Sequence, residues 1–114
     1  FSREKIESLT GKKYAAYLVP FRVIMDHLRA ATFLIADGAI PSNKDQGYFT
    51  RRLVRRAIRF AKELGVEENI AAPIVESFID SYKSAYPELE KNKENIIAAA
   101  QNEEEKFKKT LEKV

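Results

Sequence analysis

The sequence has no cysteine and no tryptophan, and it contains one histidine, four glycines and four prolines among its 114 residues. Without cysteine there is no disulfide, no thiolate nucleophile and no cysteine-bound zinc, and a single histidine excludes an all-histidine zinc site. No apolar run approaches the roughly 18 residues that cross a bilayer, and no signal-peptide pattern opens the sequence. We therefore expect a reduced, cytoplasmic single domain over residues 1–114. Because the sequence does not begin with Met and ends inside an amphipathic pattern, we expect it to be a piece of a longer protein.

Helical periodicity recurs along the whole sequence, and no strand-like alternation interrupts it. The turn residues divide the pattern into about five helices, with Pro20 at the first position of the second helix and Gly38 as its C-terminal cap. Tyr14 to Val19 is then a connector or turn. The fold class is all-α, a single antiparallel helical bundle with a long C-terminal helix. The predicted helices span residues 2–9, 20–37, 47–64, 71–85 and about 25 residues from 87 to the end.

Charge is distributed unevenly, although the net charge is only +3. Residues 44–62 carry seven basic residues and one acidic residue, whereas residues 63–114 carry seven basic and twelve acidic residues. A cationic segment beside an acidic half predicts an anionic partner that binds at one place only.

The helix predicted at 47–64 separates these charges from its apolar residues. One half of its circumference is apolar and predicted to face the core, and it holds Phe49, Leu53, Val54, Ala57, Ile58, Phe60, Ala61 and Leu64. The other half is cationic, with Glu63 as its one acid, and it holds Arg51, Arg52, Arg55, Arg56, Arg59 and Lys62.

Folding alone does not favour so many like charges, which repel by a few tenths of a kcal/mol per pair. The planar arginine fork matches phosphate oxygens, so we interpret this face as a surface laid along a phosphate backbone. The alternative is a solvated basic face that is neutralised by the acidic helices of the same domain.

The loop before this helix contains a second candidate binding group, formed by Ser42, Asn43 and Lys44. Backbone N–H groups at a helix N-terminus favour anions, and an exposed Asn amide can contact a base edge as well as a phosphate. The alternative for Ser42 and Asn43 is ordinary turn or capping duty, and for Lys44 it is a solvated charge.

Other polar residues carry no prediction of chemistry. His27 is expected to be a packed, hydrogen-bonded histidine, and the run Glu103 to Glu105 is expected to be a solvated stretch. Asp26 and Asp37 lie about three helical turns apart, which is too far for a catalytic carboxylate pair. We therefore predict no catalytic residue, no metal site and no cofactor site in this segment.

The sequence closely resembles the alanyl-tRNA synthetase family over nearly its whole length, because several separate motifs agree in the right order. These motifs are RVIMDHLRA at 22–30, FLIADG at 33–38, PSN at 41–43, GY at 47–48, RRxxRR at 51–56, AYPEL at 85–89 and EEEKFxxTL at 103–111.

The resemblance implies a helical tRNA-recognition region that lies between a class II catalytic domain and an editing domain of the same parent chain. The parent would join alanine to tRNA with ATP and Mg²⁺, and its zinc-bearing editing site would lie downstream; the motifs for both activities are absent here. The family identifies its tRNA by a G·U wobble at the third pair of the acceptor stem.

By the same resemblance, Asn43 matches the family's base-contacting Asn, and Arg51, Arg52, Arg55 and Arg56 match its phosphate-holding arginines. A partnering Asp of the family would lie beyond residue 114, which predicts incomplete recognition here. The sequence departs from the family at Gln46, where members commonly have Arg, so a phosphate contact is either lost or replaced by Lys44.

Two other functions stay open from the residues themselves. A helix-turn-helix DNA module would use residues 48–64 as its reading helix, although its arginines are spread along the whole helix rather than gathered at the N-terminal end. A structural or protein-docking bundle would bind no RNA at all.

Overall fold

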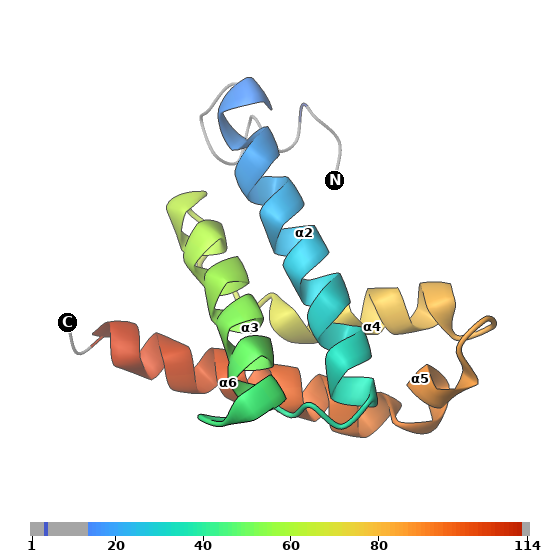
Figure 1. Cartoon of the computed structure of the whole chain (residues 1–114). Helices are drawn as coiled ribbons and strands as arrows, with labels where there is room; N and C mark the ends of the chain where they lie inside the picture. The colour runs from blue at the N-terminus through green and yellow to red at the C-terminus, as the bar shows by residue number, and fades with distance from the viewer. Residues whose placement is uncertain (1–3, 5–13, 113–114) are drawn as a thin grey trace.

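The computed structural model describes residue 4 and residues 14–112. The predicted helix at 2–9 therefore lies, apart from residue 4, outside the described residues. Within that part of the chain every element is a helix, which confirms the all-α prediction (Figure 1). The helices are α2 (Tyr14–Ala36), α3 (Asp45–Glu63), α4 (Ala71–Tyr82), α5 (Pro87–Lys91) and α6 (Lys93–Glu112).

The helix α2 begins earlier than predicted. It starts at Tyr14, so Pro20 lies inside the helix and the predicted connector is wrong. The proline ring fixes φ near −65°, which is a helical value, and its missing N–H removes only one bond to the fourth preceding carbonyl.

Glycines close both α2 and α3 as the sequence predicts. Gly38 has φ +101° and Gly65 has φ +85°, values that a side chain at Cβ would disfavour. The N–H of Gly38 donates to Ile35 O at 2.9 Å, which satisfies one of the last carbonyls of α2.

The long C-terminal helix predicted from residue 87 is in fact two helices. The break falls at Asn92, whose side-chain amide and backbone N–H both donate to the carbonyl of Glu88, at 3.0 and 3.1 Å. An Asn side chain that bonds the backbone in this way competes with helix continuation. The break allows α5 and α6 to turn against each other, so that Leu89 and Ile96 are both buried.

The helices form two antiparallel pairs that cross (Figure 1). The helices α2 and α3 run side by side in opposite directions, and α4 and α6 form the second pair beneath them. One core cluster joins α2, α3 and α6 around Leu28, Val54 and Phe107, and the other joins α2, α4, α5 and α6 around Val75 and Ile96. This arrangement buries one face of α3 and leaves its opposite face open.

Candidate nucleic-acid interface

The buried face of α3 is narrower than the sequence predicts. Val54, Ala57, Ile58 and Ala61 are buried as expected, but Phe49 is 55% exposed, so its assignment to the core is wrong. Thr50 occupies the buried position of the second turn, and Phe49 lies about 100° around the helix from it. Phe49 therefore borders the cationic face and contributes an aromatic ring to it.

The arginines of α3 divide into two rows, and the first row faces α6. Arg51 Nε donates to Glu103 Oε1 at 2.7 Å, and Arg55 Nε approaches the same oxygen at 3.3 Å. Glu103 is only 2% exposed, and the two arginine side chains are 24% and 29% exposed. Internal neutralisation, the alternative considered from the sequence, thus applies to Arg51 and Arg55. Their role as phosphate contacts stays a prediction.

The second row consists of Arg52, Arg56 and Arg59, which are exposed. None of the three forms an ion pair with a carboxylate of the described residues. Each guanidinium lies over an aromatic ring: Arg52 over Tyr48 at 5.9 Å, Arg56 over Phe60 at 5.5 Å and Arg59 over Phe107 at 5.9 Å from the ring centroid. A guanidinium at this distance from a ring face is attracted to it, while its N–H groups remain available to an acceptor. This row therefore has cation–π contacts but no carboxylate partner among the described residues.

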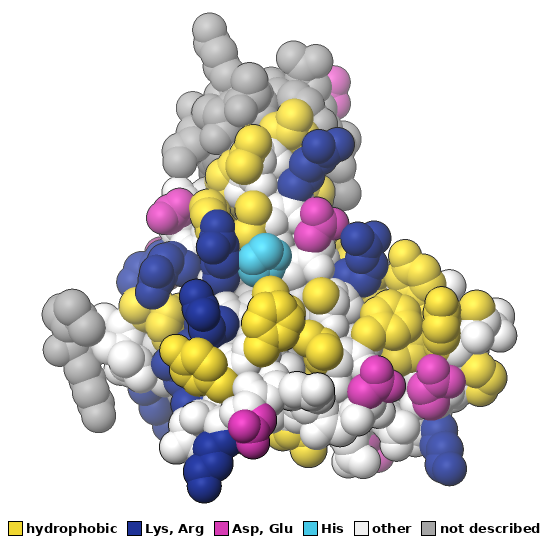
Figure 2. Space-filling view, viewed as in Figure 1, with side chains coloured by type: hydrophobic (Ala, Val, Ile, Leu, Met, Phe, Trp, Pro, Cys, Tyr) yellow, Lys and Arg dark blue, Asp and Glu magenta, His cyan; other side chains and the backbone are white. Residues whose placement is uncertain are grey.

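The second row borders a groove of about 670 Å³ between α2, α3 and the ring of Phe107. In Figure 2 the dark-blue side chains gather beside the single cyan histidine, and hydrophobic side chains lie next to both. Cationic grooves with interleaved aromatic rings are typical of surfaces that bind nucleic-acid backbones and bases. The groove is lined by His27, Phe49, Arg52, Leu53, Arg55, Arg56, Arg59, Phe60, Glu63 and Phe107.

The structure corrects the prediction for His27. Its imidazole is half-buried, lines the groove and forms no hydrogen bond with a described residue, so it is not a packed, hydrogen-bonded core histidine. Burial and then the positive charge of Arg56 lower the pKa of His27, and the carboxylate of Asp26 opposes this shift. Burial and Arg56 thus both favour the neutral form of the imidazole. Its position next to Asp26, in the narrow polar stripe of α2, was the sequence signal for its exposure.

A tight loop precedes α3. The N–H of Ser42 donates to Gly47 O at 3.0 Å, and Ser42 Oγ donates to Lys44 O at 3.1 Å and accepts from Lys44 N–H at 3.3 Å. A Cβ on Gly47 would overlap Ser42 Oγ and lie 2.5 Å from Ile40 O, so only glycine fits there. The hydroxyl of Ser42 thus performs the turn duty that the sequence left as an alternative.

The loop presents Asn43 to solvent at the N-terminal end of the helix that carries the arginines. Asn43 is exposed, and its amide forms no hydrogen bond with any described residue. Lys44 is the N-cap of α3 and provides no side-chain cap, which leaves the first N–H groups of the helix available to an anion. Gln46, at the position where the family commonly has Arg, is exposed in the same turn. Whether the phosphate contact of that Arg is lost or is made by Lys44 instead stays a prediction.

Sequence reasoning missed two carboxylates on α6, and the expected solvated stretch is wrong at both. Glu103 and Glu104 are 2% and 1% exposed. They follow Ala100 by three and four residues and precede Phe107 by four and three, so both fall within the apolar stripe of α6. That spacing was the available signal for their burial.

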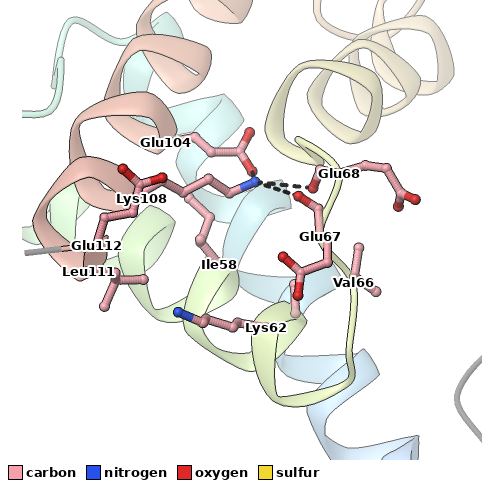
Figure 3. A pocket seen from close by; sticks show the side chains of 10 residues that line it. Ile58, Lys62, Val66, Glu67, Glu68, Glu104, Lys108, Leu111 and Glu112 are labelled. Carbon is pink, nitrogen blue, oxygen red and sulfur yellow. Dashed lines mark hydrogen bonds and ion pairs between the residues drawn. The ribbon is translucent and has the colours of Figure 1, made fainter. Parts of the chain in front are cut away.

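Glu104 binds the start of α4 rather than an arginine. Its two oxygens accept from Ile70 N–H and Ala71 N–H, each at 3.0 Å. Lys108 Nζ lies 3.6 Å from Glu104 Oε2, and it also donates to Asn69 Oδ1 at 2.7 Å. Figure 3 shows Lys108 reaching from α6 to the backbone oxygens of residues 67 and 68, both at 3.2 Å. We call this set of contacts the α6 clamp.

Residues 4 and 14–112 contain neither a metal-ligand cluster nor a helix suited to a membrane. No three His, Cys, Asp or Glu side chains of this part of the chain meet in a way that could hold a metal ion. No helix within the same residues has the length and apolar character needed to cross a membrane.

Comparison with known proteins shows which class of protein this chain resembles. A family profile described as "tRNA synthetases class II (A)" matches residues 2–113. The chain is 46% identical over 112 residues to an alanine–tRNA ligase of Anaeromyxobacter sp. (strain Fw109-5), covering 95% of this chain and 12% of that protein. It is 47% identical over 113 residues to the alanine–tRNA ligase of Borrelia hermsii, covering 95% of this chain and 19% of that protein.

The chain therefore belongs to the alanyl-tRNA synthetase family, as its sequence motifs predict. It spans only about an eighth to a fifth of the length of these relatives.

Proposed function

We propose that this chain is the tRNA-recognition domain of an alanine–tRNA ligase and that it binds the acceptor stem of tRNA(Ala), including the G·U wobble pair. Two features carry the proposal: the exposed Asn43 amide lies in the loop just before α3, and Arg52, Arg56 and Arg59 lie along α3 without an ion pair to any described carboxylate. Membership in the family supports the choice of tRNA as the ligand.

The division of labour follows from the chemistry of A-form RNA. A G·U wobble leaves the 2-amino group of G without a partner in the minor groove, which is wide and shallow enough for a side chain to reach. The amide oxygen of Asn43 would accept a hydrogen bond from that amino group. The three arginines of the second row would hold phosphates, which positions the stem but carries no sequence information.

The role of Arg51 and Arg55 in this proposal is indirect. Because both bind Glu103, they fix α3 against α6 and set the direction of the neighbouring second row. Ser42 likewise acts on Asn43 through the loop, since its hydroxyl is committed to the backbone of Lys44.

The whole enzyme is part of the same proposal. We propose that the parent chain is a class II synthetase of the cytoplasm that ligates alanine to tRNA with ATP and Mg²⁺, and that its catalytic and editing domains contact this one. We also propose that the ATP, Mg²⁺ and Zn²⁺ sites lie in other parts of the parent, as the family resemblance implies.

The test is binding of the 114-residue chain to two acceptor-stem hairpins that differ only in a G·U or G·C third pair. We expect tighter binding to the G·U hairpin, and we expect Asn43→Ala to remove about 1–3 kcal/mol of that preference. Asn95→Ala is the matched control, because Asn95 is an exposed Asn on α6. Equal losses on both hairpins for Asn43→Ala would contradict base reading.

The arginines require a separate measurement at two or more salt concentrations. Arg52→Gln should weaken both hairpins alike and lower the slope of log K against log salt by about one. Arg22→Gln, at an exposed position of α2 outside the groove, should leave the slope unchanged. Equal affinity for duplex DNA would favour the helix-turn-helix alternative, and absence of salt-dependent RNA binding would favour a structural bundle.

A further inference from the structure

The groove extends beyond α3, and among the described side chains of α2 it is His27 that lines it. The imidazole is partly open to solvent and lies in the same groove as Arg52 and Arg56. It forms no hydrogen bond with a described residue, so at least one of its nitrogens is available to a ligand. Figure 2 shows the histidine at the surface, between the dark-blue side chains and the hydrophobic ones.

The charges that surround His27 are predominantly positive. From α3 the groove receives four arginines and Glu63, and from α6 it receives only the uncharged ring of Phe107. On α2 itself, Asp26 is the one carboxylate that acts on the imidazole, and it is shared with Arg29 at 3.3 Å. The four arginines are Arg52, Arg55, Arg56 and Arg59.

We propose that His27 contacts a backbone phosphate of the bound RNA and takes up a proton as the RNA enters the groove. The inference rests on the proposed function, because it requires RNA rather than another ligand in the groove. A phosphate cancels part of the arginine charge and offers the imidazolium an acceptor, so it stabilises the protonated imidazole. The RNA interface thereby extends from α3 across the groove to α2.

The sign of the pH dependence follows by linkage. Without RNA, burial and Arg56 keep the pKa of His27 below its usual value of 6.5. An adjacent phosphate raises this pKa, so binding consumes a proton at pH values between the free and bound midpoints. RNA affinity therefore rises as the pH falls through this interval, by up to about tenfold for each unit of difference between the two midpoints.

The chain offers an unusually clean measurement, because His27 is its one histidine. Its imidazole proton resonance gives the titration midpoint directly, by NMR, for the chain alone, with the G·U hairpin and with inorganic phosphate at the same phosphate concentration. We expect the hairpin to move the midpoint upward by at least about half a unit and inorganic phosphate to move it much less.

Affinity measurements complete the test. The wild-type chain should bind the hairpin about three- to tenfold more tightly at pH 6 than at pH 8, whereas His27→Gln should bind with the same affinity at both values. Asn95→Ala should keep the wild-type pH dependence. The inference is overturned by an unmoved His27 midpoint at saturating hairpin or by an unchanged pH dependence in His27→Gln. An equal shift with inorganic phosphate would also overturn it, because any phosphate would then suffice.

The same titrations distinguish this inference from the proposed function. Absence of a G·U preference together with a shifted His27 midpoint would refute wobble-pair reading and keep the phosphate contact. A G·U preference without any shift would keep the proposed function and refute the role of His27. Failure of the chain to bind either hairpin would refute both.

Discussion

Glu103 and Glu104 are neighbours on α6, and both are buried, but they serve opposite sides of that helix. Glu103 faces α3 and binds Arg51 and Arg55, at the edge of the arginine groove. Glu104 faces the connection before α4, where it accepts two backbone N–H groups inside the α6 clamp. Adjacent identical side chains are thus divided between the candidate binding surface and the support of the fold.

The two regions also differ in how completely their charges are satisfied. In the α6 clamp, the ammonium group of Lys108 meets three acceptors besides Glu104, so the region has little capacity left for a ligand. Beside the groove, Glu103 pairs with Arg51 and Arg55, and the second arginine row forms no ion pair with a described carboxylate. Cations without a carboxylate partner are typical of a binding surface, whereas charged groups whose hydrogen-bond partners are all supplied by the protein are typical of a structural contact.

Glu104→Ala should have the largest effect on stability. It leaves two backbone N–H groups and the Lys108 ammonium without their buried acceptor, so we expect a loss of about 3–5 kcal/mol in the free energy of unfolding. Urea denaturation of the chain measures it, with the exposed neighbour Glu105→Ala as the control, expected to change by less than about 0.5 kcal/mol. A loss below about 1 kcal/mol would remove the distinction between the two carboxylates.

Glu103→Gln should have a smaller effect on stability and an opposite effect on binding. The substitution keeps an acceptor but removes the charge, and its arginine partners remain partly solvated, so we expect a loss of about 1–3 kcal/mol. Because Arg51 and Arg55 lose their internal anion, RNA binding should tighten for both hairpins. The slope of log K against log salt should become steeper by about 0.7–0.9 for each arginine that then reaches a phosphate, which is one or two arginines here. Filter binding at several salt concentrations measures the slope, and an unchanged slope would show that Arg51 and Arg55 do not reach the RNA.

The two arginine rows can be compared directly with Arg55→Gln and Arg56→Gln. Arg56→Gln should weaken RNA binding and lower the salt slope by about one, while stability changes by less than about 0.5 kcal/mol. Arg55→Gln should instead reduce stability, because Glu103 loses one of its two partners. Denaturation measures the stability of both variants, and salt titration measures their RNA binding. Equal changes in stability and in salt slope for the two variants would contradict the division into rows.

The smallest expected effect is the pH dependence of stability at His27. Its pKa is lower in the folded chain than its usual value of 6.5, so the unfolded chain binds the proton more readily and stability falls as the pH drops through about 6.5. Solvent screening at this half-buried position keeps the effect below about 1 kcal/mol. Thermal unfolding at pH 7.5 and 5.5 should show a decrease in Tm that is smaller in His27→Gln, and an equal decrease in both would assign it to other groups.

Local chemistry explains which parts of the fold were predictable. The ends of α2 and α3 follow from glycines that adopt positive φ, and the start of α4 follows from an apolar period with Pro73 in its first turn. The predicted helix start at Pro20 and the predicted single helix across Asn92 are both wrong. Each residue changes only one or two hydrogen bonds of its helix, and whether the helix continues or breaks there depends on the packing around it.

The sequence by itself determined the all-α class, the cationic face of α3 and the family motifs, because helical periodicity and motif spacing are properties of neighbouring residues. Only the tertiary structure decided which arginines are bound by Glu103, that Glu104 supports α4, and that His27 enters the groove. The contacts of Glu103 and Glu104 join residues 33 to 52 positions apart, and the groove joins side chains of separate helices. No local pattern specifies them, since they depend on how the two helix pairs cross.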